Sequence, residues 1–381
     1  MKEYIFRDPV HGNVAVTDET VMGLIQSPEF QRLRRVRQLG TSFISYPGAE
    51  HTRFAHSLGV YHLMVLVLKY LNDHQIVEVT QEQMTLGACA ALLHDVGHGP
   101  FSHLFEKLTG LHHERWTERI ITAPETEVNR VLTARDPALP GQIAAMIRGD
   151  YQGAPFLKEL LSSQMDVDRM DYLLRDSRMC GVTYGQFDLD RLVQTLTVTD
   201  GHIALSPKGL TSVEEFILAR YFMYWNVYFH KATRSIELVL ERMIRRAMEL
   251  LQEGYPLPVP AALVPVLTKQ ELSLEQYLEL DETDVLYAIK SWRQVQDPIL
   301  RDLADRFINR RLFTGLRIEG APTPEQQAAV AALLTDRGFD PAYYMGIDKT
   351  GSVAYKYYVP SNDVGGPRPI YVQADWKPGA P

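Results

Sequence analysis

Apolar residues recur at helical spacing through most of the first 311 positions, and the polar residues between them mark helix ends. Thr80 and Gln83 have the spacing of a capping box ahead of an apolar run that continues to Leu93. Ser27 precedes Pro28, and proline is typical of the first position of a helix. The pattern predicts a mainly α protein with a helical core over residues 46–311.

Two short segments depart from the helical pattern. Leu196–Thr199 and His202–Leu205 flank Asp200-Gly201, a dipeptide typical of tight turns, so we expect a short β-hairpin there. Apolar residues then return at helical period from Ser212 to Leu251, which predicts one long, buried helix.

The texture of the chain changes again from residue 312. We expect a short strand around Leu316–Ile318, a helix over Pro324–Arg337, and strands over Tyr343–Ile347 and Val353–Val359. Residues 312–381 are therefore predicted to form a small α+β region after the helical core.

Composition and charge narrow the functional classes. A formal net charge of −8 at pH 7 argues against broad nucleic-acid binding, because a surface that neutralises phosphates normally needs a basic excess. Two cysteines, Cys89 and Cys180, provide neither a disulfide framework nor a zinc ribbon, and they fit a reducing cytoplasm. The longest apolar run, Leu63–Leu68, is too short to span a bilayer, and no signal-type segment opens the sequence. We expect a cytoplasmic protein without a membrane anchor.

The strongest chemical signal is a run of metal-ligating side chains. The apolar run that ends at Leu93 is followed at once by His94 and Asp95, and imidazole and carboxylate together suit a divalent cation. His56 stands at the start of another apolar helix, and Asp166, Asp168 and Asp171 form an acidic stripe on a later one. Two histidines, Asp95 and one aspartate of the stripe would leave open positions for water and substrate. Spacing alone does not choose between Asp168 and Asp171.

Three blocks carry a family resemblance: PGAEHTRFAHSLG, HDVGHGPFSH and DVDRMDYLLRD. They resemble the HD-domain superfamily of metal-dependent phosphohydrolases, and in particular its deoxynucleoside-triphosphate triphosphohydrolase branch; further blocks extend the likeness from Phe6 to Lys231. The resemblance implies a divalent cofactor, which among Mg²⁺, Mn²⁺, iron, nickel and zinc it does not distinguish. The implied ligands are His56, His94, Asp95 and Asp168.

The resemblance also implies roles in catalysis and substrate binding. Phosphoryl transfer needs an acid or base and positive charge for the growing oxyanions. The implied acid/base group is His103, Glu106 and His113, with His103 and Glu106 spaced to pair on one helix face. The residues implied to hold the triphosphate or test the sugar are Arg53, Arg220, Tyr224, Tyr228, Lys231, Gln38, Leu39, Tyr172 and Asp176. Positions 220, 224, 228 and 231 share one face of the predicted long helix; the alternative there is an ordinary amphipathic helix with aromatic packing.

Members of this branch assemble as tetramers with activating nucleotides at their interfaces, which implies such a role for residues 1–45. Gln31 and Arg34 match the regulatory positions, whereas Gln26 and Arg7 depart from them, so the resemblance does not name the activator. The cluster of Arg32, Arg34, Arg35 and Arg37 predicts either a phosphate-binding interface or a solvated helix face.

The sequence thus predicts metal-dependent hydrolysis of deoxynucleoside triphosphates to deoxynucleoside and tripolyphosphate. One alternative is another HD-type enzyme: a guanosine-tetraphosphate hydrolase, a cyclic-dinucleotide phosphodiesterase or a nucleoside monophosphatase. The Val-Gly-His-Gly segment after Asp95 argues against the first two. A second alternative is a nucleotide sensor that binds without turnover.

Overall fold

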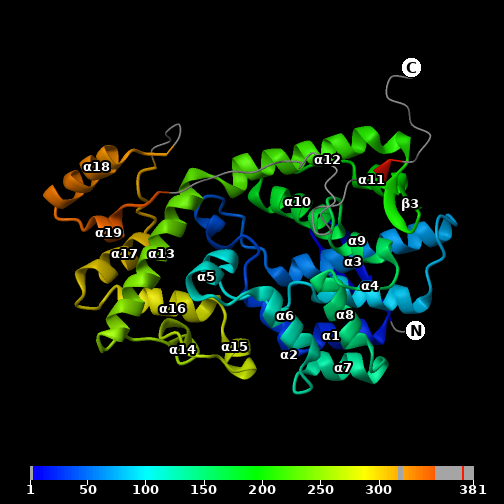
Figure 1. Cartoon of the computed structure of the whole chain (residues 1–381), viewed down its shortest axis with the longest axis horizontal. Helices are drawn as coiled ribbons and strands as arrows, with labels where there is room; N and C mark the ends of the chain where they lie inside the picture. Colours follow the sequence, from blue (N-terminus) through cyan, green and yellow to red (C-terminus); the bar gives the residue numbers. More distant parts are fainter. Residues whose placement is uncertain (1–2, 316–320, 348–370, 373–381) are drawn as a thin grey trace.

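The structure, a computed structural model, describes residues 3–315, 321–347 and 371–372 (Figure 1). Within them the fold is mainly α-helical, as predicted. The first half contains β1 (Tyr4–Asp8), β2 (Gly12–Val16), α1 (Glu19–Gln26), α2 (Pro28–Arg32), η1 (Leu33–Arg35), η2 (Gly40–Ile44), α3 (Arg53–Asp73), α4 (Gln81–Leu93), α5 (Ser102–Thr109), α6 (His113–Thr122), α7 (Glu127–Arg135), α8 (Leu139–Arg148), α9 (Pro155–Leu161) and α10 (Val167–Cys180).

The remaining elements begin with α11 and the second hairpin. They are α11 (Leu189–Thr195), β3 (Leu196–Thr199), β4 (His202–Leu205), η3 (Pro207–Gly209), α12 (Leu210–Met223), η4 (Tyr224–Tyr228), α13 (Lys231–Gln252), α14 (Val264–Leu267), α15 (Leu274–Glu279), α16 (Glu282–Trp292), α17 (Pro298–Ile308), α18 (Pro324–Asp336), α19 (Pro341–Tyr344) and β5 (Tyr371–Val372).

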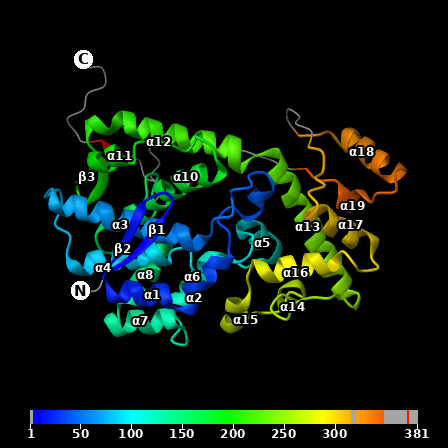
Figure 2. The same ribbon diagram turned by 180° about the vertical axis from the view of Figure 1, so that it is seen from behind.

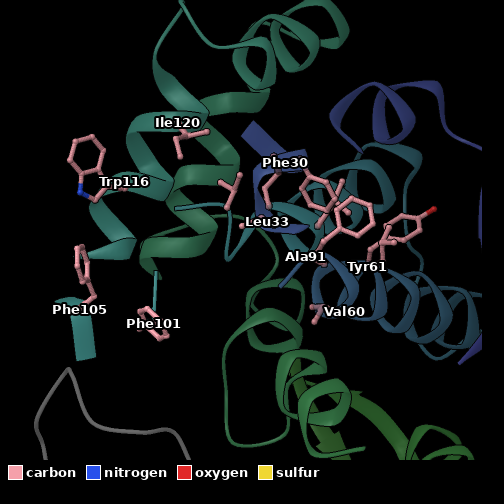
Figure 3. Close-up of a cluster of buried hydrophobic side chains, with 14 of the residues drawn as sticks. Phe30, Leu33, Val60, Tyr61, Ala91, Phe101, Phe105, Trp116 and Ile120 are labelled. Carbon is pink, nitrogen blue, oxygen red and sulfur yellow. The ribbon is translucent and has the colours of Figure 1, made fainter. Parts of the chain in front are cut away.

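The core of the fold is the packing of α3 against α4 and α10. Figure 3 shows Val60 and Tyr61 beside Ala91, with Phe30 and Leu33 over them, and all five side chains are buried. By length and hydropathy alone, α3 could cross a membrane. However, 67% of its most apolar 18-residue stretch is buried inside the protein, as in the core helix of a folded domain. This packing fixes the first turn of α3 relative to the end of α4, which is where the predicted metal ligands lie.

Local signals predicted several elements correctly. The Thr80–Gln83 capping box is present, and Ser27 caps α2 with Pro28 in its first turn. The β3–β4 hairpin pairs Leu196 with Leu205 in antiparallel register, and both Asp200 and Gly201 adopt the left-handed conformation that its tight turn requires. β5 adds to β4 in parallel, so two residues of the C-terminal region join this sheet.

Two predictions for the second half of the chain were wrong. The long helix expected over Ser212–Leu251 is interrupted: α12 ends at Met223, a π-helical turn covers Tyr224–Tyr228, and α13 starts at Lys231. The strand expected over Tyr343–Ile347 is instead a short helix, α19, because Asp340 caps it and Pro341 occupies its first turn. The helix near Pro324 is confirmed as α18, whereas the strands expected around Leu316–Ile318 and Val353–Val359 lie outside the described residues.

Candidate metal centre and catalytic site

Two buried imidazoles meet where α3 begins and α4 ends. His56 lies in the first turn of α3 and is fully buried, and His94 follows directly after α4. Their ring centroids are 5.2 Å apart, with the planes at 73°. His94 Nδ1 is 2.9 Å from the carbonyl oxygen of Ala91, which leaves its Nε2 atom as the ligating nitrogen.

Two carboxylates complete the group. Asp168 Oδ1 lies 3.1 Å from His56 Nε2 and 3.7 Å from His94 Nε2, while Asp95 Oδ1 lies 3.5 Å from His94 Nε2. Neighbouring ligands around an ion with bonds of about 2.1 Å are themselves separated by roughly 3 to 3.5 Å, so these spacings suit one cation. Both Nε2 atoms are buried without a hydrogen-bond partner among the described residues, an arrangement that a divalent ion would satisfy. The residues present therefore fit a metal.

The structure places Asp168 and Asp171 on opposite sides of His56. Asp171 is fully buried, and its Oδ2 atom lies 2.7 Å from His56 Nδ1, away from the other candidate ligands. Burial disfavours the charged form of His56, but Asp168 and Asp171 outweigh burial and raise the pKa of His56 to about 10. Burial likewise opposes ionisation of Asp168, yet His56 and His94 hold the pKa of Asp168 below its usual value.

Arg53, which the sequence assigned to phosphate binding, is buried against Asp95. Its Nη1 atom donates to Asp95 Oδ2, and His98 Nδ1 lies 3.2 Å from Asp95 Oδ1. Burial opposes ionisation of Asp95, but Arg53 and His98 keep the pKa of Asp95 well below its usual value. Asp95 is therefore held as a charged carboxylate that points toward His94.

A second polar cluster lies beside this group and joins His98, Glu106 and His113. The rings of His98 and His113 stack with centroids 3.8 Å apart, and Glu106 Oε1 accepts from both the backbone N–H (2.6 Å) and Nδ1 of His113. The predicted Glu106 and His113 are thus brought together from α5 and α6. His103 lies in α5, but its side chain is outside what the structure describes, so its expected pairing with Glu106 remains a prediction.

Sequence reasoning assigned no role to His98, and a signal for it was present. His98 stands three residues after Asp95 in the same run, a spacing that returns a side chain toward Asp95 when the chain turns after a helix. Arg32 fixes this turn, because its guanidinium donates to the carbonyl oxygens of Val96 (3.1 Å) and His98 (2.7 Å).

Two of the predicted sugar-binding residues, Tyr172 and Gln38, are linked to Asp176 through Tyr228 and His51. The two oxygens of Asp176 lie 2.7 Å from His51 Nε2 and 2.7 Å from the Tyr228 hydroxyl group, which donates to Asp176. Tyr172 meets Tyr228 edge-on, with centroids 6.3 Å apart. The backbone N–H of Gln38 donates to the carbonyl oxygen of His51, and Gln38 Oε1 is buried without a partner among the described residues. Leu39, the next residue, packs at the edge of the core. The sequence did not single out His51, which contacts both Asp176 and the backbone of Gln38.

The residues predicted on one long helix face are separated by the π-helical turn. Arg220, near the end of α12, donates to Gln164 Oε1 (3.1 Å) and lies over the ring of Tyr224. Tyr224 contacts Tyr228 with centroids 5.0 Å apart. Lys231 is exposed at the first position of α13, beyond the break, so these four residues do not lie on one continuous helix as expected.

Most of the arginine cluster has partners inside the protein. Arg32 is buried, Arg35 pairs with Asp281, and Arg37 pairs with Glu50 and Glu282. The predicted regulatory pair, Gln31 and Arg34, is joined by a hydrogen bond of 2.8 Å from Arg34 Nε to Gln31 Oε1, and the Arg34 guanidinium covers the Phe54 ring. Within this cluster, Arg34 is the exposed member that lacks a carboxylate partner in the described residues.

Comparisons with known proteins agree with this geometry. Sequence signatures of the HD domain and of the HD associated region match residues 53–176 and 187–256. The uncharacterized protein YwfO of Bacillus subtilis is 41% identical over 364 residues, covering 95% of this chain and 83% of that protein. The deoxynucleoside triphosphate triphosphohydrolase SAMHD1 of Gallus gallus is 30% identical over 279 residues, covering 64% of this chain and 45% of its own length.

A solved structure supports the same assignment. The crystal structure of a phosphohydrolase from Bacteroides thetaiotaomicron matches with a TM-score of 0.82 and 31% sequence identity, covering 90% of this chain and 86% of the other. HD domains depend on a metal, and the grouped His56, His94 and Asp95 side chains meet that requirement here. The chain belongs to the HD-domain phosphohydrolases, in the branch similar to the deoxynucleoside triphosphate triphosphohydrolases.

Proposed function

We propose that this hydrolase cleaves deoxynucleoside triphosphates between the deoxyribose O5′ atom and the α-phosphate, releasing deoxynucleoside and tripolyphosphate. The observation that carries the proposal is one face of α10, on which Asp168, Tyr172 and Asp176 follow each other at intervals of one helical turn. In this proposal Asp168 is a metal ligand near the phosphate, Tyr172 packs against the sugar, and Asp176 binds the ribose. Their order along α10 matches the order of phosphate and ribose in a nucleotide. Relatives named as deoxynucleoside triphosphate triphosphohydrolases support the same substrate class.

The proposed ligands are His56, His94, Asp95 and Asp168. A divalent ion held there would supply an activated water and charge stabilisation at the phosphoryl group. The chain's own residues have the remaining tasks. Arg220 already donates to a neutral acceptor, the Gln164 side-chain oxygen, so its positive charge remains available for phosphate oxygens.

Proton transfer is proposed for the histidine groups near α5. Glu106 accepts from His113 Nδ1, which fixes the tautomer of His113 and leaves its Nε2 atom to exchange a proton. His103 is proposed to donate a proton to the leaving O5′ atom, a role that the family resemblance implies. Arg53 is proposed to orient Asp95 rather than to contact the triphosphate directly, because its guanidinium is buried against that carboxylate.

Sugar recognition is proposed for the group around Asp176. Asp176 already bonds to His51 and Tyr228, and the buried Gln38 Oε1 atom offers an acceptor for a hydroxyl group. Leu39 and Tyr172 are proposed to crowd the C2′ position, which would disfavour ribose by steric exclusion. The 2′-deoxy specificity follows from that wall rather than from any hydrogen bond.

Product analysis tests the proposal. Purified protein with Mn²⁺ or Mg²⁺ is incubated with each deoxynucleoside triphosphate, singly and in pairs, and phosphate products are separated by ion-exchange chromatography. We expect tripolyphosphate and deoxynucleoside in equal amounts, and no turnover in the double variant His94→Ala, Asp95→Ala. Release of orthophosphate or pyrophosphate would instead favour a different HD-type phosphohydrolase, and binding without turnover would favour a nucleotide sensor.

We also propose that the protein acts in the cytoplasm as a homotetramer, with Gln31 and Arg34 at an activating-nucleotide site. The exposed Arg34 supports this, since, unlike Arg35 and Arg37, it has no carboxylate partner among the described residues, and its charge is available to a phosphate. Light scattering with and without each nucleotide tests assembly, and Arg34→Ala should lose any nucleotide-dependent gain in mass or rate.

A further inference from the structure

The turn of the N-terminal β-hairpin reaches the buried side of the metal centre. Figure 2 shows β1 and β2 lying across α3, and the turn between the two strands carries His11. His11 Nε2 lies 2.6 Å from Asp171 Oδ1, although the two residues are 160 positions apart in sequence. Their side chains are 4% and 0% exposed, so this contact forms inside the protein.

Asp171 joins three elements through both of its oxygens. Oδ2 lies 2.7 Å from His56 Nδ1 and accepts from Arg175 Nε at 2.8 Å. Oδ1 lies 2.6 Å from His11 Nε2 and accepts from Arg175 Nη2 at 2.9 Å. Four contacts from α3, α10 and the hairpin turn therefore fix the position of this one carboxylate.

Asp8 holds the hairpin side of the network. It accepts from the backbone N–H groups of Val10 (2.8 Å) and His11 (2.9 Å), which shapes the turn so that the His11 ring points inward. Its other oxygen accepts from Arg175 Nη1 at 2.7 Å. Arg175 thus bridges Asp8 and Asp171, and the hairpin is tied to α10 at two points.

The contact between Asp171 and His56 determines which ring nitrogen of His56 points toward the other metal ligands. A ring that donates through Nδ1 to a carboxylate keeps its Nε2 lone pair for a ligand, and the partner carboxylate also fixes the ring orientation. His56 Nε2 is the atom that faces Asp168 at 3.1 Å. If Asp171 moved, the ring could turn and Nε2 would no longer point toward the other ligands.

We infer that Asp171 is the positioning residue for His56, and that Asp8 and His11 hold Asp171 in place, so that the β1–β2 hairpin completes the metal centre. The HD-domain signature begins at residue 53 and does not include the hairpin. This inference rests on the ligand set of the proposed function. It adds a task for residues that do not touch the metal or the substrate.

Substitutions at His11 test the inference through metal affinity rather than turnover. Metal-free His11→Leu, His11→Gln and wild-type protein are titrated with Mn²⁺ by calorimetry, and thermal unfolding is followed in parallel. Loss of an outer partner of a metal-bound histidine typically weakens binding about 10- to 100-fold. His11→Leu keeps that partner, Asp171, but removes one of the contacts that hold it, so we expect a measurable loss of affinity that does not exceed that range. His11→Gln keeps a donor near the position of Nε2 and should recover most of the affinity.

A matched control separates positioning from general stability. His202 Nδ1 lies 2.7 Å from Glu159 Oε1 and ties β4 to α9, so His202→Leu removes a comparable histidine–carboxylate contact elsewhere in the fold. It should keep wild-type Mn²⁺ affinity. If His11→Leu does not fold, Asp8→Asn carries the same test, because it keeps the shape of Asp8 but weakens its hold on Arg175.

The outcomes are distinguishable. The inference is overturned if folded His11→Leu or Asp8→Asn binds Mn²⁺ with wild-type affinity and loses only as much thermal stability as His202→Leu. The hairpin would then only stabilise the fold. If the wild-type protein binds Mn²⁺ but does not hydrolyse deoxynucleoside triphosphates, the proposed function fails while weaker binding in His11→Leu still supports the inference.

Discussion

Gly59 on α3 faces the side chains of Asp171 and Arg175 on α10, and replacing it with alanine should break the Asp171 network. A Cβ atom at position 59 would lie 1.8 Å from Asp171 Oδ1 and 2.5 Å from Arg175 Nη2, whereas real Cβ atoms essentially never come within 3.0 Å of such neighbours. The carboxylate would have to withdraw by more than an ångström. Its contacts with His11, His56 and Arg175 are 2.6 to 2.9 Å long, so a shift of that size breaks several of them at once.

The cost follows from the burial of the pair. Asp171 and Arg175 are both fully buried, and disrupting a buried ion pair costs about 3–5 kcal/mol. Alanine is favoured over glycine inside a helix by about 1 kcal/mol, which offsets part of the loss. We expect Gly59→Ala to lower the free energy of unfolding by about 2–4 kcal/mol, measured by urea denaturation at pH 7, and to weaken Mn²⁺ binding.

Gly141 supplies the control for this substitution. It lies in α8, is exposed, and an added Cβ atom would meet nothing within 4 Å. Gly141→Ala should therefore leave stability unchanged or raise it by up to about 1 kcal/mol. If Gly59→Ala unfolds at the same urea concentration as wild type, or behaves like Gly141→Ala, the reasoning from close packing at Asp171 is wrong.

Three further predictions address the catalytic site. Glu106→Gln should lower kcat about 10²-fold or more with little change in KM, because the amide no longer holds the His113 tautomer; an unchanged kcat would remove Glu106 from proton transfer. Tyr277→Phe should cost about 1–3 kcal/mol in urea denaturation, since the Tyr277 hydroxyl donates to the buried Gly97 carbonyl oxygen at 2.6 Å; a neutral effect would contradict that bond. Burial lowers the pKa of His56, but Asp168 and Asp171 raise it to about 10 in the metal-free protein, so Mn²⁺ must displace a proton from His56 to bind. The Mn²⁺ affinity should therefore rise with pH between about 6.5 and 9, and calorimetry should detect released protons. A pH-independent affinity would contradict the cause assigned to the shift.

Elements with a local signal were predicted from the sequence, and elements set by distant contacts were not. The β3–β4 hairpin and the α4 capping box follow from residues two or three positions apart. The break between α12 and α13 has no such signal, because apolar and aromatic residues continue at helical period across it. Distant contacts act on this segment: the Tyr46 hydroxyl donates to the Asn226 carbonyl oxygen at 2.5 Å, and Tyr228 donates to Asp176.

In the candidate site, too, residues close together in sequence were predictable and contacts between distant residues were not. His94 and Asp95 are adjacent in sequence, so their contribution to one centre was predictable from the sequence. The role of Asp171 was not, since its partners His11 and His56 lie 160 and 115 positions away. Spacing on α10 allowed both Asp168 and Asp171 to point toward the ligands; the structure separates them because Arg175, one turn beyond Asp171, holds that carboxylate on the far side of His56.

The central claim is that one divalent ion binds among His56, His94, Asp95 and Asp168. Anomalous diffraction from crystals of the Mn²⁺-loaded protein measures this directly. We predict a single strong manganese peak about 2.0–2.3 Å from both Nε2 atoms and from one oxygen of each carboxylate. A peak among His98, Glu106 and His113 instead, or one beyond bonding distance of His56 or Asp168, would contradict the account.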